Sequence, residues 1–236
     1  MICFAFLVSI SAKSLPADGS LLQGDAHILF LCVDGEQTTL ALCMDFDLDR
    51  RAVSVWALPP DAGYPAGETS ASLAAVYLTD GLAGAMQAVS TRLSLRLDRG
   101  IACTAKQFVA LTEKLGDAQI TVPESVSFTH AGAIVERPAG PCALSGEDLY
   151  EYLLYGATGD VSAFRTAAAA DMLRSYFNPS NAAKGETLFE TLINGTDSDI
   201  TAYDFAAHAD TILAMSAPDA LTFTGCGLLT TGRSNG

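Results

Sequence analysis

Apolar residues gather in short, uninterrupted runs along the first sixty residues of the chain. Those at 27–33, 39–46 and 52–58 have the length of ordinary β-strands. They are too continuous for strands with one solvent-facing side and are typical of strands covered on both faces. The sequence therefore predicts three buried strands, the first closed by Asp34-Gly35 and the third by Pro59-Pro60.

Helical spacing of apolar residues dominates the rest of the chain. A helix pair is predicted at 70–79 and 82–93, broken at Asp80-Gly81, and Thr104 to Gln107 forms a capping box that opens a helix to about residue 115. Further helices are expected at 145–155, 160–177, 185–193 and 201–215, and further strands at 118–122 and 220–224. Residues 123–144, rich in Pro, Gly and small residues, are expected to be irregular.

These elements predict the fold class. Strands and helices occur along one chain without a repeat or a linker, which favours one α/β domain over 26–225, followed by a tail at 226–236. Its mixed central β-sheet should be flanked by helices on both faces. With half of its 236 residues hydrophobic and 17% charged, the chain can bury a full core.

Charge narrows the possible partners. The chain carries 27 Asp and Glu against 13 Lys and Arg, a net charge of −14. Lys and Arg supply most of the non-specific affinity for nucleic acid, so this balance argues against nucleic-acid binding.

The first twelve residues form an apolar run of the length of a signal-peptide core. We interpret residues 1–25 as the remnant of an export signal or membrane anchor with its linker, which places the protein outside the cytoplasm. The alternative is a first core strand.

Six cysteines are present, without a CxxC pair or a Cys/His cluster, which argues against zinc. Disulfides are possible in an exported protein. Cys32 and Cys43 lie in successive predicted strands and could be cross-strand neighbours. Buried free thiols are the favoured interpretation, because free Cys is among the most buried residue types.

Acidic residues follow the predicted strands at two places. Asp34 comes directly after the first strand and Asp61 after the third, while Asp160 begins a predicted helix. Ligands collect at the carboxyl ends of strands in parallel α/β sheets, and clustered carboxylates attract a cation such as Mg²⁺. The alternative is that Asp34 and Asp61 are turn residues and Asp160 is a helix cap.

One segment connects the chain to a known family. Residues 159–167 (GDVSAFRTA) resemble the Gly-Asp-x-x-Arg-x-x-Arg-Gln signature of the LytR-CpsA-Psr family, exported enzymes that move glycopolymers from a polyprenyl-pyrophosphate carrier to the cell wall. Weaker matches keep their order over residues 27–215. The resemblance implies a three-layer α/β/α fold and a cell-envelope location close to the membrane. The partner it implies is a polyprenyl-linked glycan or a cell-wall polymer.

The resemblance also implies roles for particular residues. By position, Asp34 and Asp61 match the metal ligands, with Mg²⁺ as the expected ion. The family's ligand-binding positions are matched by Asp61, Tyr77 and Tyr152. Its catalytic positions are matched by Asp160 and Arg165. The helical stretches 73–77, 149–154 and 163–173 could line a pocket for the lipid tail, or they could be ordinary core.

The departures at the family's cationic positions all remove positive charge. Arg165 is the one cation near the signature, one place out of register. The family's cationic positions are here occupied by Glu36, Pro60, Ser72, Leu154, Gly156, Ala163 and Thr166. Because Arg supplies strong bidentate bonds to phosphate, we expect a family member without efficient catalysis. It would bind the polyprenyl carrier or glycan, or act as a partner of active family members. The alternatives are an active Mg²⁺-dependent phosphotransferase and an unrelated α/β domain.

Overall fold

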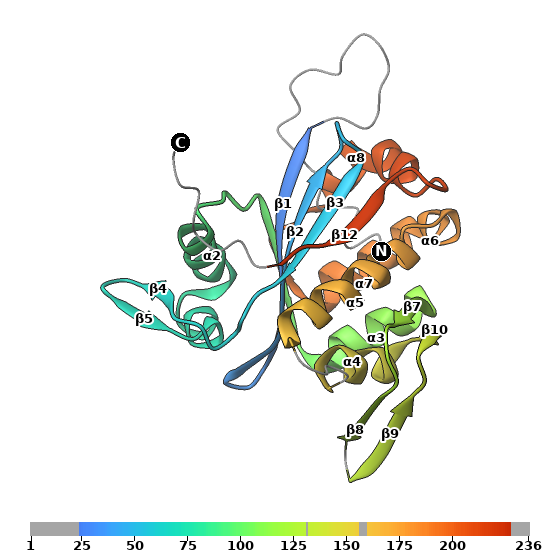
Figure 1. Cartoon of the computed structure of the whole chain (residues 1–236). Helices are drawn as coiled ribbons and strands as arrows, with labels where there is room; N and C mark the ends of the chain where they lie inside the picture. The colour runs from blue at the N-terminus through green and yellow to red at the C-terminus, as the bar shows by residue number, and fades with distance from the viewer. Residues whose placement is uncertain (1–23, 131, 156–159, 228–236) are drawn as a thin grey trace, which may run out of the picture.

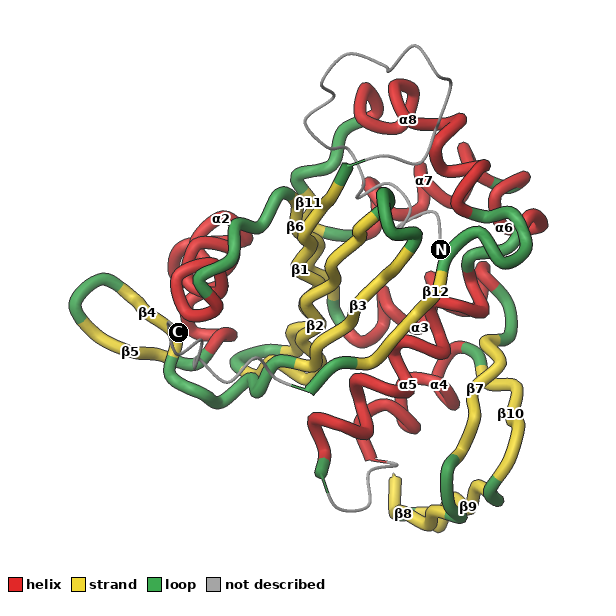
Figure 2. The backbone as a smooth tube through the Cα atoms, turned by 45° about the horizontal axis from the view of Figure 1, so that its top comes forward, coloured by secondary structure: helices red, strands yellow, loops and turns green. Residues whose placement is uncertain are grey.

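The computed structural model describes residues 24–130, 132–155 and 160–227. Its centre is a six-stranded sheet with the order β11-β6-β1-β2-β3-β12 (Figures 1 and 2). The strands are β1 (Asp25–Asp34), β2 (Gln37–Asp47), β3 (Ala52–Ala57), β6 (Arg99–Cys103), β11 (Asp197–Ser198) and β12 (Thr222–Gly225). The β1–β6 and β3–β12 pairs are parallel and the others antiparallel, so the predicted mixed sheet is confirmed.

Both faces of the sheet are covered, as the continuous apolar runs predicted. In β1, Ile28 and Phe30 belong to one hydrophobic cluster, while their neighbours Leu29 and Leu31 belong to another on the opposite face. All four side chains are buried. This arrangement follows from the two-residue period of a strand, which sends successive side chains to opposite sides.

Helices form the outer layers. Helix α2 (Leu73–Leu93) covers one face of the sheet, and the remaining helices gather on the other (Figure 1). These are α3 (Ala105–Leu115), α4 (Gly146–Tyr155), α5 (Val161–Tyr176), α6 (Pro179–Ala183), α7 (Gly185–Gly195) and α8 (Ala202–Met215). None of the helices in the described ranges combines the length and apolar composition needed to cross a bilayer.

Several predicted helix boundaries are confirmed by the caps. Thr104 and Gln107 form the expected capping box, and the side chain of Asp160 caps α5. Gly81 interrupts α2 with φ 69° and ψ −168°, a conformation open to glycine, which kinks the helix at the predicted break. The first half of α2 starts later than predicted, because Ser72 is its cap and residues 64–71 form the hairpin β4 (Tyr64–Ala66) and β5 (Thr69–Ala71).

The prediction of an irregular segment at 123–144 is wrong. The segment holds the hairpin β8 (Val126–His130) and β9 (Ala133–Arg137), followed by β10 (Gly140–Leu144), which pairs with β7 (Ala118–Val122). Two of its glycines have positive φ, Gly132 in the β8–β9 turn (+81°) and Gly140 at the first position of β10 (+116°). The Pro, Gly and small residues of this segment therefore indicate connections between short strands.

The suggestion that Cys32 and Cys43 are cross-strand neighbours is also wrong. In the β1–β2 register, Cys32 faces Leu40 and Cys43 faces Leu29, and the two sulfurs lie on opposite faces of the sheet. Both are buried free thiols, as the favoured interpretation expected.

Candidate functional site

A cavity of about 490 Å³ lies where the β1–β2 turn, the end of β3 and the start of α5 meet. Its walls come from segments far apart in the sequence. The described lining residues are 37–39, 57–61, 154–155, 160–162 and 165. Three of the predicted site residues, Asp61, Asp160 and Arg165, therefore share one cavity.

The start of α5 is fixed to the sheet by side-chain hydroxyls. Oγ of Ser162 donates to the carbonyl of Ala57 (3.1 Å), and Oγ1 of Thr166 accepts from the N–H of Ala57 (2.8 Å). Strand β12 pairs with β3 only as far as Val55, so Ala57 lies beyond its neighbour strand. The two hydroxyls therefore make the hydrogen bonds to Ala57 that a neighbouring strand would otherwise make. They hold α5 in place as one wall of the cavity.

Asp160 is the helix cap that the alternative interpretation described. Its Oδ1 accepts from the backbone N–H groups of Ser162 (2.9 Å) and Ala163 (3.1 Å). A carboxylate at a helix N-terminus is stabilised by the unpaired N–H groups and the helix dipole. Asp160 lines the cavity as well, so the capping role and a ligand-binding role are compatible.

Arg165 is held by backbone carbonyls at the end of α4. Its Nε donates to the carbonyl of Leu153 (3.1 Å) and one Nη to that of Leu154 (3.2 Å). Burial lowers the pKa of Arg165. The guanidinium thus satisfies carbonyls that a helix end leaves without intrahelical partners.

Asp34 does not line the cavity. It is the exposed last residue of β1, paired in register with Gln37. In the parts of the chain that the structure describes, no three His, Cys, Asp or Glu side chains are grouped so as to hold a metal ion. The residues present thus offer Mg²⁺ only the Asp61 and Asp160 carboxylates in the cavity, and the metal site stays a prediction.

Known structures show the same architecture. The sequence itself matches no family model and no curated protein well enough for an assignment. A candidate transcription regulator from Eubacterium siraeum is similar with a TM-score of 0.74 at 14% identity, covering 92% of this chain and 89% of that one. Bacillus subtilis TagV is similar with a TM-score of 0.65 at 15% identity (81% and 80% covered), and TagT bound to LI-WTA with 0.61 at 14% (89% and 81%). The fold is that of the LytR-CpsA-Psr family.

Several of the positions where the LytR-CpsA-Psr family carries a cation lie at the cavity or beside it. Pro60 and Leu154 line the cavity, and Thr166 is buried against Ala57 as part of the α5 attachment. By the resemblance, residues without positive charge therefore occupy three of the family's cationic positions, two in the cavity wall and one in its support.

The two predicted tyrosines lie away from the cavity. Tyr77, on α2, donates a hydrogen bond to Asp197 (3.0 Å), and burial raises its pKa to about 12. Tyr152 is 1% exposed in the core, edge-on to Phe164 with ring centroids 5.0 Å apart. Their ligand-binding roles stay predictions that these positions do not support.

The suggested lipid-tail pocket also needs correction. Its stretch 73–77 packs on one face of the sheet, whereas 149–154 and 163–173 pack on the other. The three stretches therefore cannot line one pocket, and core packing accounts for their buried faces.

The cavity lining also holds Thr38 and Thr39, to which the sequence assigned no ligand-binding role. Thr39 Oγ1 accepts from the hydroxyl of Tyr150 (2.8 Å) and donates to the carbonyl of Cys32 (3.2 Å). Thr38 is 8% exposed, and its Oγ1 has no hydrogen-bond partner among the described residues. By the family resemblance, Thr38 stands where a second metal-binding Asp is expected, and a pair of hydroxyl residues after a strand turn is by itself common in turns without any site.

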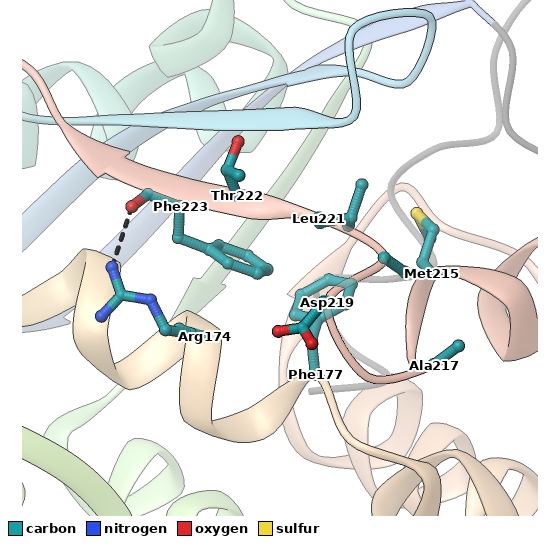
Figure 3. A pocket seen from close by; sticks show the side chains of 9 residues that line it. Arg174, Phe177, Met215, Ala217, Asp219, Leu221, Thr222 and Phe223 are labelled. Atoms are coloured by element: carbon teal, nitrogen blue, oxygen red, sulfur yellow. Dashed lines mark hydrogen bonds between the residues drawn. The ribbon is translucent and has the colours of Figure 1, made fainter.

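A second cavity, of about 460 Å³, lies between α5, α8 and β12 (Figure 3). Phe177 and Phe223 lie in its wall with ring centroids 5.2 Å apart, and Arg174 donates to the carbonyl of Phe223 (2.9 Å). No predicted site residue lines it.

Proposed function

We propose that this chain is a cell-envelope protein that binds a polyprenyl-linked glycan or cell-wall polymer without efficient catalysis. The observation that carries the proposal is the loss of positive charge at the cavity. Pro60 and Leu154 stand in its wall where the family has cations, and Arg165 is bound to the carbonyls of α4.

The energetic consequence for phosphate transfer is large. Hydrogen bonds from Arg to phosphate are charge-assisted and bidentate. Removing one partner of such a buried pair costs about 2–5 kcal/mol. With several absent together, the developing charge of a phosphoryl transition state would have too few donors for efficient transfer.

The fold comparisons support a glycan-polymer partner, since TagT, with the same fold, has been solved bound to LI-WTA. An extracytoplasmic location is part of the proposal. It rests on the fold and on the apolar run at residues 1–12, which lies outside the described residues.

A binding and turnover experiment tests the proposal. Purified protein would be mixed with a disaccharide linked to a short polyprenyl pyrophosphate, with and without Mg²⁺. Ligand at 100 times Kd stabilises a protein by about 2.7 kcal/mol. For a chain of this size the melting temperature should rise by about 5–11 °C. We expect this shift without release of polyprenyl phosphate, and Mg²⁺-dependent release would refute the absence of catalysis.

An active Mg²⁺-dependent phosphotransferase is the second candidate, favoured by the shared cavity of Asp61, Asp160 and Arg165. It predicts turnover that Asp61→Asn abolishes, with Asp210→Asn on the exposed side of α8 as the matched control. Equal turnover by both variants would rule out the second candidate.

A further inference from the structure

Two cysteines lie next to each other on neighbouring strands of the central sheet. Strands β1 and β6 are parallel, and Cys32 of β1 is the register partner of Cys103, the last residue of β6. Both side chains belong to the same hydrophobic cluster, so they lie on the same face of the sheet. Neighbouring strands are about 4.7–4.9 Å apart, which is within the Cα separation of about 4.4–6.8 Å that a disulfide spans. The backbone therefore holds the two residues at a separation that a disulfide can bridge.

The two thiol groups also interact directly. A hydrogen bond from the side chain of Cys103 lowers the pKa of Cys32, and this effect outweighs burial, which raises the pKa. Neither cysteine is part of a disulfide in the described structure, which is therefore the reduced form of the pair. Because the thiols are already in contact, closing the bond requires movement of the side chains and no rearrangement of the strands.

Cys43 provides a comparison within the same sheet. It is as buried as Cys32, since both are 0% exposed, but it lies on the opposite face. Its register partners are Leu29 and Trp56, and burial raises its pKa to about 12. The thiolate is the form that attacks a disulfide. Cys32 is therefore the more reactive of these two buried thiols.

The pair lies at a weakly held part of the sheet. Strand β6 has five residues, and β11, its neighbour on the outer side, has two (Figure 2). Short strands with few neighbours open locally more readily than the middle of a sheet. Cys103 is 5% exposed, so an oxidant can reach the pair when this end of β6 opens. A covalent bond to the ten-residue strand β1 would hold β6 in place.

We propose that Cys32 and Cys103 form a reversible disulfide that ties β6 to β1 when the protein meets a disulfide oxidant. The Cys32 thiolate attacks one sulfur of the oxidant, and the other sulfur leaves as a thiolate. The Cys103 thiolate then attacks the Cys32 sulfur of the mixed disulfide and displaces the second thiolate. The two protons of the pair pass to the released thiolates, and two electrons pass from the protein to the oxidant. This bond does not depend on the proposed polymer binding.

Oxidised glutathione is the probe that tests the proposal. Reduced protein would be incubated with it, blocked with iodoacetamide and digested with trypsin for mass spectrometry. We expect one disulfide, joining peptide 100–106, which contains Cys103, to peptide 14–50, which contains Cys32. Cys43 is in the same peptide as Cys32, so variants make the assignment. Cys43→Ala should form the same cross-link, whereas Cys32→Ala should not.

Thermal denaturation tests whether the bond fits the native fold. The disulfide would close a loop of about 70 residues, which should raise the melting temperature of a chain of this size by about 4–16 °C. We expect this rise in the oxidised wild type and in oxidised Cys43→Ala, and its loss after treatment with dithiothreitol. Cys103→Ala should melt at the same temperature with and without oxidised glutathione.

Three results would overturn the proposal. The first is that Cys43→Ala forms no cross-link between the two peptides, either as folded protein or when refolded with oxidised glutathione. The second is a cross-link that lowers the melting temperature, because the bond would then strain the sheet. The third is a cross-link that persists in Cys32→Ala, because it would assign the bond to Cys43.

Discussion

Replacing Arg165 by methionine tests whether this side chain serves the fold rather than a phosphate. The change removes the bonds to the carbonyls of Leu153 and Leu154 but keeps a long apolar side chain. Hydrogen bonds that involve a charged group contribute about 1.5–3 kcal/mol each. Burial opposes the charge, as the lowered pKa of Arg165 indicates, so we expect a net loss of about 2 kcal/mol. For a chain of this size, that loss lowers the melting temperature by about 4–8 °C.

Thermal and urea denaturation measure this effect directly. Arg96→Met is the matched control, because Arg96 has a side chain 83% exposed and should give little change. Arg165→Lys should restore part of the stability, since an ammonium group can reach one of the carbonyls. If Arg165→Met has the same melting temperature as the wild type but no longer binds the ligand, Arg165 faces the ligand and the structural role is refuted.

Two further substitutions test the supports of the site, and a third tests the pH dependence of stability. Thr166→Val leaves the N–H of Ala57 without its acceptor and should cost about 1–3 kcal/mol in urea denaturation, whereas Thr166→Ser should not. Gly225→Ala places a Cβ 3.0 Å from backbone atoms of α5 and should cost about 1–3 kcal/mol. Gly195→Ala, whose Cβ would meet no atom of the described residues within 4 Å, is the control, and equal stability of the two variants would contradict the close approach. Burial lowers the pKa of His208, so the folded chain binds that proton less readily than the unfolded chain, and wild-type stability should fall as pH drops below about 6.5. His208→Gln should reduce this loss at pH 5 and change little at pH 8, and identical pH profiles would contradict it.

The sequence predicted those elements whose signals are local. Buried strands appeared as apolar runs, and the caps at Thr104 and Asp160 depend on residues three positions away at most. Strand β6 (Arg99–Cys103) was missed, because it is short and contains glycine. A Cβ at Gly100 would lie 2.7 Å from Sδ of Met86 on α2, so the side chain of Met86 would have to shift, a tertiary contact that no local pattern contains.

The candidate site was likewise predictable only where its signals are local. Carboxylates after strands were expected at one edge of the sheet, and Asp61 does share a cavity with Asp160. The use of Arg165 could not be predicted, since its acceptors are backbone carbonyls, which every residue carries. Similarly, the lone hydroxyl of Thr38 became a feature only through burial, which depends on the packing around it.

The position of β12 has a consequence for the order in which the molecule assembles. Strands β1 to β3 pair with neighbours in the sequence, but Thr222 bonds to Arg51 across 171 residues. Contacts of such long range form slowly because of the loop that must close. Until they form, β3 presents an open edge with Val53 and Val55, which can pair with another chain. Self-association during refolding should therefore depend on how quickly the last strand docks.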